Sequence, residues 1–160
     1  MIMRLGLAAS IGVMCASVAP RPGFRLAVAG PAPLASGWVA LAPAPSPYGI
    51  GVTEDGRILY DLDIAVHDLP PASSLGPYAA YDAWLATPDL ALVRHLGVVR
   101  NDATLRARAD WNKFTVVISA EPVAVGARWH GPIVLSGRSP SALMQSFAGH
   151  SFYNTGMPPE

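Results

Sequence analysis

The chain holds four histidines, and imidazole is a common protein ligand of copper and zinc. They are His67, His95, His130 and His150, and no two of them are paired at strand or helix spacing. We therefore interpret them as separate surface residues. One alternative stays open, because imidazole and thioether groups together suit copper. The ligands of that copper site would be His130, Met144, His150 and Met157.

Carboxylates and hydroxyls offer a second kind of chemistry, general acid and base catalysis. Asp61 and Asp63 alternate with apolar residues on one strand, but a solvated polar face compensated by Arg57 explains them more simply. A Ser-His-Asp set can be drawn from Ser119, His95 and Asp82, as it can in many chains of this length. The Gly-x-Ser-x-Gly elbow of the hydrolases is missing from the sequence. We expect a protein that is not an enzyme and needs no cofactor.

Tryptophans and their neighbours offer a third function, contact with another protein. We interpret Trp84, in a mostly apolar segment, as the core tryptophan of the domain. Other aromatic residues lie in loops or the tail, beside an arginine in one case, and such residues are common at interfaces. The candidates are Trp111, Arg128, Trp129, Phe152 and Tyr153. Alternatively, the two loop tryptophans cover the ends of the domain.

Composition narrows the classes of partner. The chain of 160 residues has zero formal net charge, and 14% of its residues are charged. This balance gives no electrostatic footprint for nucleic acid or for anionic lipid. Cys15 is the single cysteine, so a disulfide framework is excluded.

The N-terminus resembles an export signal. Arg4 precedes an apolar run over residues 5–19, which is the order of charge and hydrophobicity in a secretory signal. An uncleaved membrane anchor is the alternative. Residues 1–35 are therefore predicted to be a signal peptide or anchor followed by a proline- and alanine-rich linker, and the protein is predicted to be periplasmic or otherwise extracytoplasmic.

The elements that must position these residues are mostly strands. Residues 57–67 alternate between apolar and polar side chains, and the Asp55-Gly56 turn before them indicates a hairpin. Similar segments are expected at residues 37–41, 49–53, 78–87, 90–100, 104–109, 113–120 and 132–136. Residues 36–138 are thus predicted to form an all-β domain, an immunoglobulin-like antiparallel β-sandwich of seven to eight strands. Ser139 and Pro140 predict one short helix, within a C-terminal extension over residues 139–160.

Within this domain, residues 76–137 carry four short motifs in a recognisable order. They are Tyr-Asp-Ala-Trp-Leu from Tyr81, Leu-Gly-Val from Leu96, the apolar run from Phe114 to Glu121-Pro122, and Gly-Pro-Ile-Val-Leu-Ser-Gly from Gly131. The stretch resembles the extracytoplasmic C-terminal domain of anti-sigma-K factors. The resemblance implies the fold and the extracytoplasmic setting. The family's Gly-Gly-Ser after Glu-Pro is absent from this sequence, and we expect neither the family's sigma-binding segment nor its full transmembrane helix before the domain. Sigma-factor regulation is therefore not carried over.

These observations favour a non-catalytic extracytoplasmic interaction module. We expect it to be an accessory or structural subunit of a larger membrane-associated bacterial complex, for example an electron-transfer or photosynthetic one. Its partner would then be a protein, and the N-terminus a possible membrane anchor. The alternatives are a small periplasmic copper-binding protein and a sensory domain related to anti-sigma factors.

Overall fold

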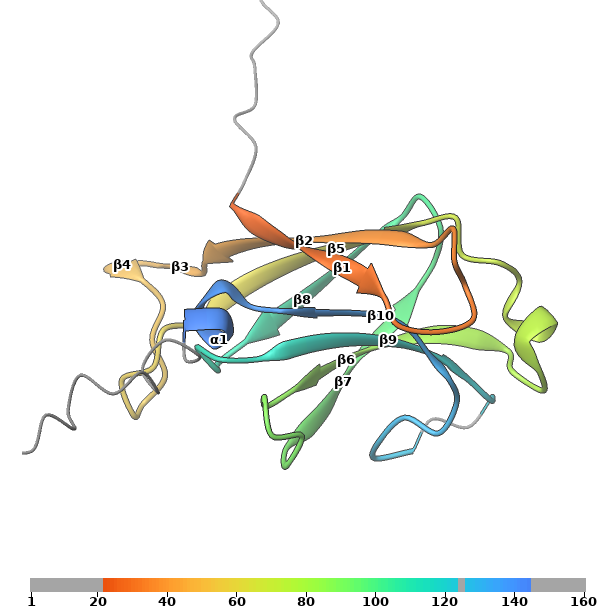
Figure 1. Ribbon diagram of the computed structural model, residues 1–160. Coiled ribbons are helices and arrows are strands. Elements are labelled where there is room, and N and C mark those ends of the chain that lie inside the picture. Colours follow the sequence, from red (N-terminus) through yellow and green to blue (C-terminus); the bar gives the residue numbers. More distant parts are fainter. Residues whose placement is uncertain (1–21, 124–125, 145–160) are drawn as a thin grey trace, which may run out of the picture.

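The fold is a sandwich of two antiparallel layers, given by a computed structural model that describes residues 22–123 and 126–144. Figure 1 shows the two layers, with β2 and β5 in one and β9, β6 and β7 in the other. Sheet A contains β1 (Gly23–Val28), β2 (Ser36–Pro43), β5 (Tyr60–His67) and β8 (Thr104–Ala109). Sheet B contains β10 (Ile133–Arg138), β9 (Thr115–Glu121), β6 (Ala80–Ala86) and β7 (Val93–Val99). The prediction of an all-β sandwich is confirmed.

Strand β1 connects the two sheets. Its residues 23–26 pair with β2, and its residues 27–28 pair with β10. The hydrogen-bonded order is therefore continuous, β7-β6-β9-β10-β1-β2-β5-β8. Only the two outermost strands, β7 and β8, end the sheet, and they lie close to each other.

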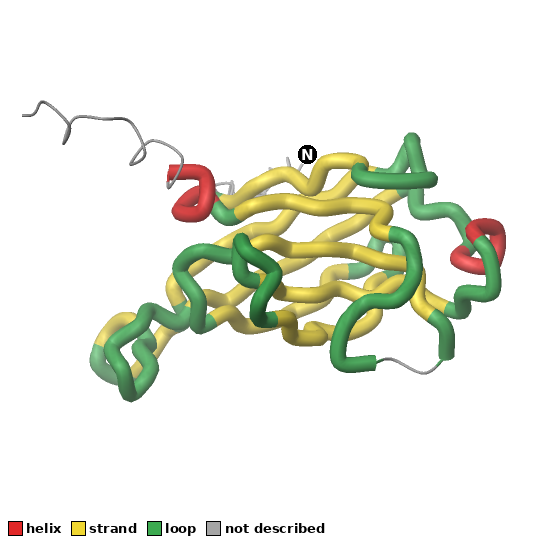
Figure 2. The backbone as a smooth tube through the Cα atoms, turned by 60° about the horizontal axis from the view of Figure 1, so that its bottom comes forward, coloured by secondary structure: helices red, strands yellow, loops and turns green. Residues whose placement is uncertain are grey.

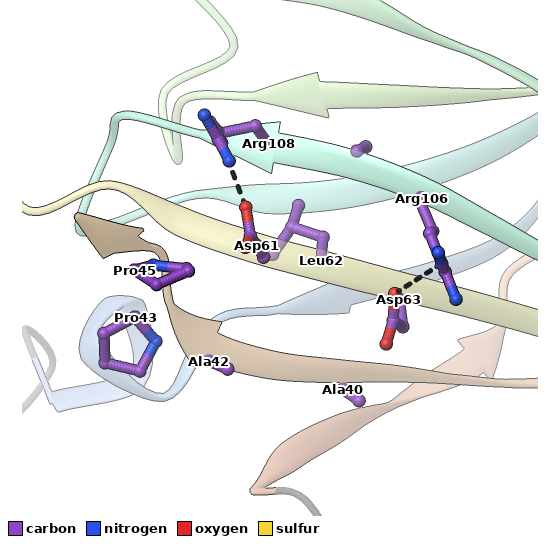
Figure 3. Close-up of a pocket in the computed structure, with 10 residues that line it drawn as sticks. Ala40, Ala42, Pro43, Pro45, Asp61, Leu62, Asp63, Arg106 and Arg108 are labelled. Carbon is purple, nitrogen blue, oxygen red and sulfur yellow. Dashed lines mark hydrogen bonds and ion pairs between the residues drawn. The ribbon is translucent and has the colours of Figure 1, made fainter. Parts of the chain in front are cut away.

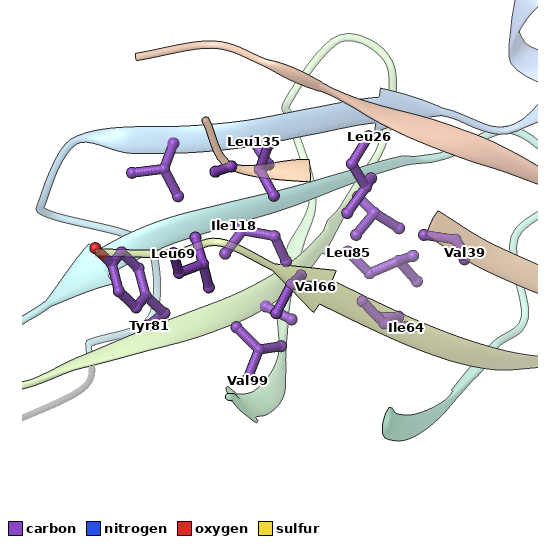
Figure 4. Packing of buried hydrophobic residues seen from close by; sticks show 14 of the residues in the cluster. Leu26, Val39, Ile64, Val66, Leu69, Tyr81, Leu85, Val99, Ile118 and Leu135 are labelled. Atoms are coloured by element: carbon purple, nitrogen blue, oxygen red, sulfur yellow. The ribbon is translucent and has the colours of Figure 1, made fainter. Parts of the chain in front are cut away.

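The core fills the space between the layers, as the alternation of apolar residues dictates. Every second residue of β5 and β6 points inward, so that Ile64 and Val66 from one sheet meet Tyr81 and Leu85 from the other. Figure 4 shows these side chains packed together with Ile118 of β9. Burial of these apolar side chains is the main stabilising term of such a domain.

Four smaller elements lie outside the two sheets. Strands β3 (Pro45–Ser46) and β4 (Gly49–Ile50) form a short hairpin between β2 and β5. A 3₁₀ turn, η1 (Ala72–Leu75), precedes β6, and helix α1 (Pro140–Met144) follows β10. Figure 2 shows the hairpin and α1 at one end of the sandwich and η1 at the other. Within residues 22–123 and 126–144, none of the helices has the length and hydrophobicity needed to cross a membrane.

Several strands differ in extent from the expected ones. The sandwich begins earlier than predicted, because Gly23–Val28 forms β1 in the stretch expected to be linker. The strand expected from residue 57 starts at Tyr60, while Val52 and Ile58 form an isolated bridge around the Asp55-Gly56 turn. The strand expected at residues 49–53 is only the short β4. Helix α1 starts at Pro140 as predicted, and its expected continuation to residue 147 lies outside the described residues.

A β-bulge in β7 is a further difference. The register against β6 shifts between His95 and Gly97, which leaves Leu96 unpaired. The alternation expected over residues 90–100 placed Leu96 and Val98 on the same side of this strand. That prediction is wrong, because the extra residue reverses the alternation. Leu96 packs against the core, while Val98 is exposed on the outer side.

Candidate functional site

The polar residues that could do chemistry gather on the outer face of sheet B. We call Asp82, His95, Ser119, Glu121 and His130 the polar cluster. Asp82 and Ser119 are direct cross-strand partners on β6 and β9, and Glu121 follows two residues after Ser119, on the same side of the strand. Asp82, Ser119 and Glu121 are buried, although they lie outside the apolar core between the sheets. The loop residues 126–132, which precede β10, contribute the fifth member, His130.

One half of the polar cluster is a carboxylate and an imidazole. Nε2 of His95 lies 2.6 Å from Oδ1 of Asp82. The bulge in β7 brings His95 opposite Trp84 in register, and the two rings are 4.8 Å apart. Oδ2 of Asp82 is buried and finds no hydrogen-bond partner among the described residues. A buried oxygen in this position costs desolvation free energy that no contact offsets.

The other half connects a tryptophan to a glutamate. The indole N–H of Trp84 donates to Oγ of Ser119 over 2.9 Å, and the Ser119 hydroxyl donates in turn to Oε1 of Glu121. The backbone N–H of His130 reaches both carboxylate oxygens of Glu121, at 3.2 and 3.1 Å. Glu121 therefore attaches the loop over residues 126–132 to the sheet.

Trp84 is fully buried, as predicted, but it lies outside the apolar cluster that fills the space between the sheets. It alternates with Ala83 and Leu85, which point into the core, and so lies on the outer face. There Trp129 of the loop packs edge-on against it, with 6.3 Å between the rings. The indole is thus covered by a loop from its own sheet.

Ser119, His95 and Asp82 are brought into one region, yet they do not form a nucleophilic triad. In such a triad the histidine accepts the serine proton while the carboxylate holds its other nitrogen. Here the Ser119 hydroxyl donates to Glu121 and accepts from Trp84, and it is fully buried. The hydrogen bonds run as two separate sets, so the arrangement is suited to fixing side chains in place.

Glu121 was not among the site residues expected from the sequence, although it is the group that connects the sheet to the loop. A signal was present: a carboxylate at the end of a mostly apolar strand, on the same side as Ser119. Charged residues are seldom fully buried unless they are paired. Asp82, within a strand whose other residues are apolar, carries the same signal.

The outer face of sheet A carries the second group of charges. Asp61 pairs with Arg108 at 2.9 Å, and Asp63 lies 3.9 Å from Arg106. Figure 3 shows these pairs beside a shallow groove lined by small residues of β2. The expected compensation by Arg57 is wrong, because Arg57 pairs with Asp55 in the hairpin turn. The charges of Asp61 and Asp63 are compensated instead by Arg108 and Arg106 of the neighbouring strand β8.

The copper ligands considered from the sequence are only partly described. His130 precedes β10 and Met144 ends α1 after it, so the two lie at opposite ends of that strand. Six strand residues separate them by about 20 Å. His150 and Met157 lie outside the described residues. Among the residues that are described, no three His, Cys, Asp or Glu side chains are placed to hold a metal ion.

The interface candidates differ in their surroundings. Trp111 is half-buried against the core, and the guanidinium of Arg94 lies 5.1 Å from the centre of its ring. Arg128 is exposed and donates to the backbone oxygen of Leu90 over 3.1 Å. Trp129 is half-buried on Trp84. Phe152 and Tyr153 lie outside the described residues.

Comparisons of the chain with protein-family models, curated proteins and solved structures find no match. The resemblance to anti-sigma-K domains stays a prediction.

Proposed function

We propose that this protein is a non-catalytic extracytoplasmic interaction module, an accessory subunit that binds a membrane-associated protein complex. It does so through a surface on sheet B that we call the loop face, made of His95, Val98, Arg128, Trp129 and His130. The observation that carries the proposal is the chain of contacts from Glu121 through Ser119 and Trp84 to Trp129. That chain holds a half-exposed tryptophan rigidly at the surface.

Burial of the charged groups beneath this face supports a role beyond stability. Removing carboxylates from water costs more than their hydrogen bonds usually return, so apolar residues would stabilise the fold equally well. The sandwich already has a separate apolar core between its sheets. Asp82 even leaves one buried oxygen without a partner in the described part of the chain. Such costs are typical of surfaces kept for function.

The side chains of the loop face fit a protein partner. Tryptophan and arginine are among the residues most enriched where binding free energy is concentrated. Trp129 is held by Trp84, and Arg128 by the backbone of Leu90, so little conformational freedom is lost on binding. Val98 adds an exposed apolar side chain to the same face.

The test is extraction of the tagged full chain from its native membrane in mild detergent, followed by identification of the proteins that co-purify. Trp129→Ala is expected to lower recovery of a specific partner about 30-fold, the effect of losing roughly 2 kcal/mol at a dominant contact. Trp38→Ala is the matched control, because Trp38 is an exposed tryptophan on the opposite sheet. Equal recovery with both variants would contradict the proposal.

A further inference from the structure

Exposed apolar side chains are concentrated at one end of the sandwich. Seven of the twelve large exposed apolar residues in the described part of the chain lie there. They come from the β3–β4 hairpin and the residues after it, from the loop between β6 and β7, and from α1. They are Tyr48, Ile50, Val52, Leu90, Leu92, Leu143 and Met144.

Strand register places these segments at the same end. Pro43, Tyr60 and Ala109 are aligned across β2, β5 and β8 where the hairpin begins. In sheet B, Ala86 and Thr115 are aligned beside the loop between β6 and β7, and Thr115 pairs with a residue just before α1. The short connection from β8 to β9 links these strand ends of sheet A to those of sheet B. Figures 1 and 2 agree in showing the hairpin and α1 at this end.

The chain also enters the domain from this end. The backbone oxygen of Pro22 accepts a hydrogen bond from Leu41 over 2.7 Å, and Leu41 lies two residues before the end of β2. The apolar run over residues 5–19 precedes Pro22 with only two residues between. A membrane segment in that position would therefore hold this end of the sandwich toward the bilayer.

The residues themselves suit a lipid interface. Tyr48 stands at the tip of the hairpin with its side chain 100% exposed, and tyrosine is enriched at the level of lipid headgroups. Exposed aliphatic side chains accompany it on three separate segments. Lys113 and Arg138 are exposed near the same end, but so are the acidic Glu54 and Asp89, so the apolar side chains must supply most of the affinity for lipid.

We propose that this end of the sandwich rests on the surface of a phospholipid bilayer, with Tyr48, Leu92 and Met144 inserted among the headgroups. The proposal rests on the extracytoplasmic, membrane-associated setting of the proposed function. It assigns the sandwich an orientation in which the loop face is turned to the side, toward a protein partner.

The experiment uses the full chain reconstituted into vesicles of phosphatidylcholine and phosphatidylglycerol. In a Cys15→Ser background, Tyr48→Cys, Met144→Cys and Leu34→Cys each carry an environment-sensitive fluorophore. Leu34 is the matched control, because it is 82% exposed but lies in the loop between β1 and β2 at the other end. We expect blue-shifted emission and quenching by doxyl-labelled lipids at positions 48 and 144, and neither at position 34.

Three results would overturn the proposal. Emission at position 48 that stays as in water would mean that the N-terminal segment tethers the domain without this contact. A blue shift without lipid quenching would mean that a second copy of the chain covers the end. Equal quenching at position 34 would mean unspecific adsorption. Loss of partner recovery in Trp129→Ala is read in a separate sample, so the two proposals fail independently.

Discussion

Two carboxylates hold the residues of the polar cluster in place, and each does so through different contacts. Asp82 holds the ring of His95, and Glu121 holds Ser119 and the backbone of the loop through His130. Both carboxylates are buried, so each depends on its partners for the hydrogen bonds that water would otherwise supply. Loss of one partner should therefore cost more than loss of an exposed hydrogen bond.

Ser119→Ala tests this dependence. The substitution leaves the indole N–H of Trp84 without its acceptor and removes the hydroxyl that donates to Oε1 of Glu121, both in a buried place. We expect the free energy of unfolding to fall by about 2 to 3 kcal/mol. Urea unfolding followed by tryptophan fluorescence measures it. Ser36→Ala, at an exposed position of β2, should change it by less than about 0.5 kcal/mol; equal effects would show that the network contributes nothing.

Tyr81 should make the free energy of unfolding depend on pH in the alkaline range. Burial raises the pKa of its phenol above the ordinary value of 10.0, and the hydroxyl donates to the backbone oxygen of Pro70 over 2.9 Å. Because the pKa is raised in the folded state, the contribution of the neutral phenol to the free energy of unfolding is fully present below about pH 10. It is lost as the pH rises through the pKa that the phenol has in the folded protein. We expect Tyr81→Phe to reduce this loss in unfolding experiments between neutral and alkaline pH. Tyr48→Phe, at a wholly exposed position, should leave the profile of the wild-type protein unchanged.

In the secondary-structure elements, the bulge in β7 sets the position of His95. Gly97 follows the bulge with φ at +140°, a conformation that side chains with a Cβ rarely adopt. A Cβ at that position would also lie 3.2 Å from Leu105 of β8. The bulge thus needs a glycine, and it decides which residues of β7 face the polar cluster.

Gly97→Ala should therefore act on both stability and the site. We expect a loss of about 1 to 3 kcal/mol in the free energy of unfolding, because the backbone conformation becomes strained. The imidazole signals of His95 in an NMR spectrum should shift as the ring moves relative to Asp82. Gly56→Asn is the control, since that turn also has positive φ but open space and a residue type that tolerates it. Unchanged His95 signals in a destabilised Gly97→Ala protein would contradict the positioning role.

For the molecule as a whole, Arg94 joins the two outermost strands. Its Nη2 donates to the backbone oxygen of Arg108 over 3.1 Å and to Oδ1 of Asp110 over 2.8 Å, while its guanidinium lies near the ring of Trp111. Open strand edges invite pairing with other chains, and a side chain that bonds to an edge carbonyl reduces that tendency. Arg94 thus helps to keep the sandwich closed between β7 and β8.

Arg94→Met keeps the apolar stem and removes the charge. We expect about 1 kcal/mol less stability, because the ion pair is partly exposed, and faster amide hydrogen exchange confined to β8 and its neighbour β7. Exchange in β2 should not change. Arg106→Met, which removes a 90% exposed side chain from β8, is the control. Uniformly faster exchange would show that Arg94 supports the fold as a whole and not this edge.

Several features of the fold followed from local sequence alone. Alternation in residues 57–67 predicted β5, and the Asp55-Gly56 turn predicted the chain reversal that places Val52 opposite Ile58, because both depend on neighbours within a few residues. Pro140 likewise marked the start of α1. The site could not be read in this way, since Trp84 and Ser119 are 35 residues apart and meet only through the pairing of β6 with β9.

Amino-acid order was thus enough to specify that the chain forms strands, where most of them lie, and that apolar side chains fill a sandwich. The face that each polar residue occupies emerged only when the sheets were assembled. One unpaired residue in β7 reverses the alternation beyond it, and a loop over sheet B converts an outer face into a buried one for Trp84 and Glu121. Periodicity records only the alternation of side chains, whereas burial depends on what the rest of the chain lays over them.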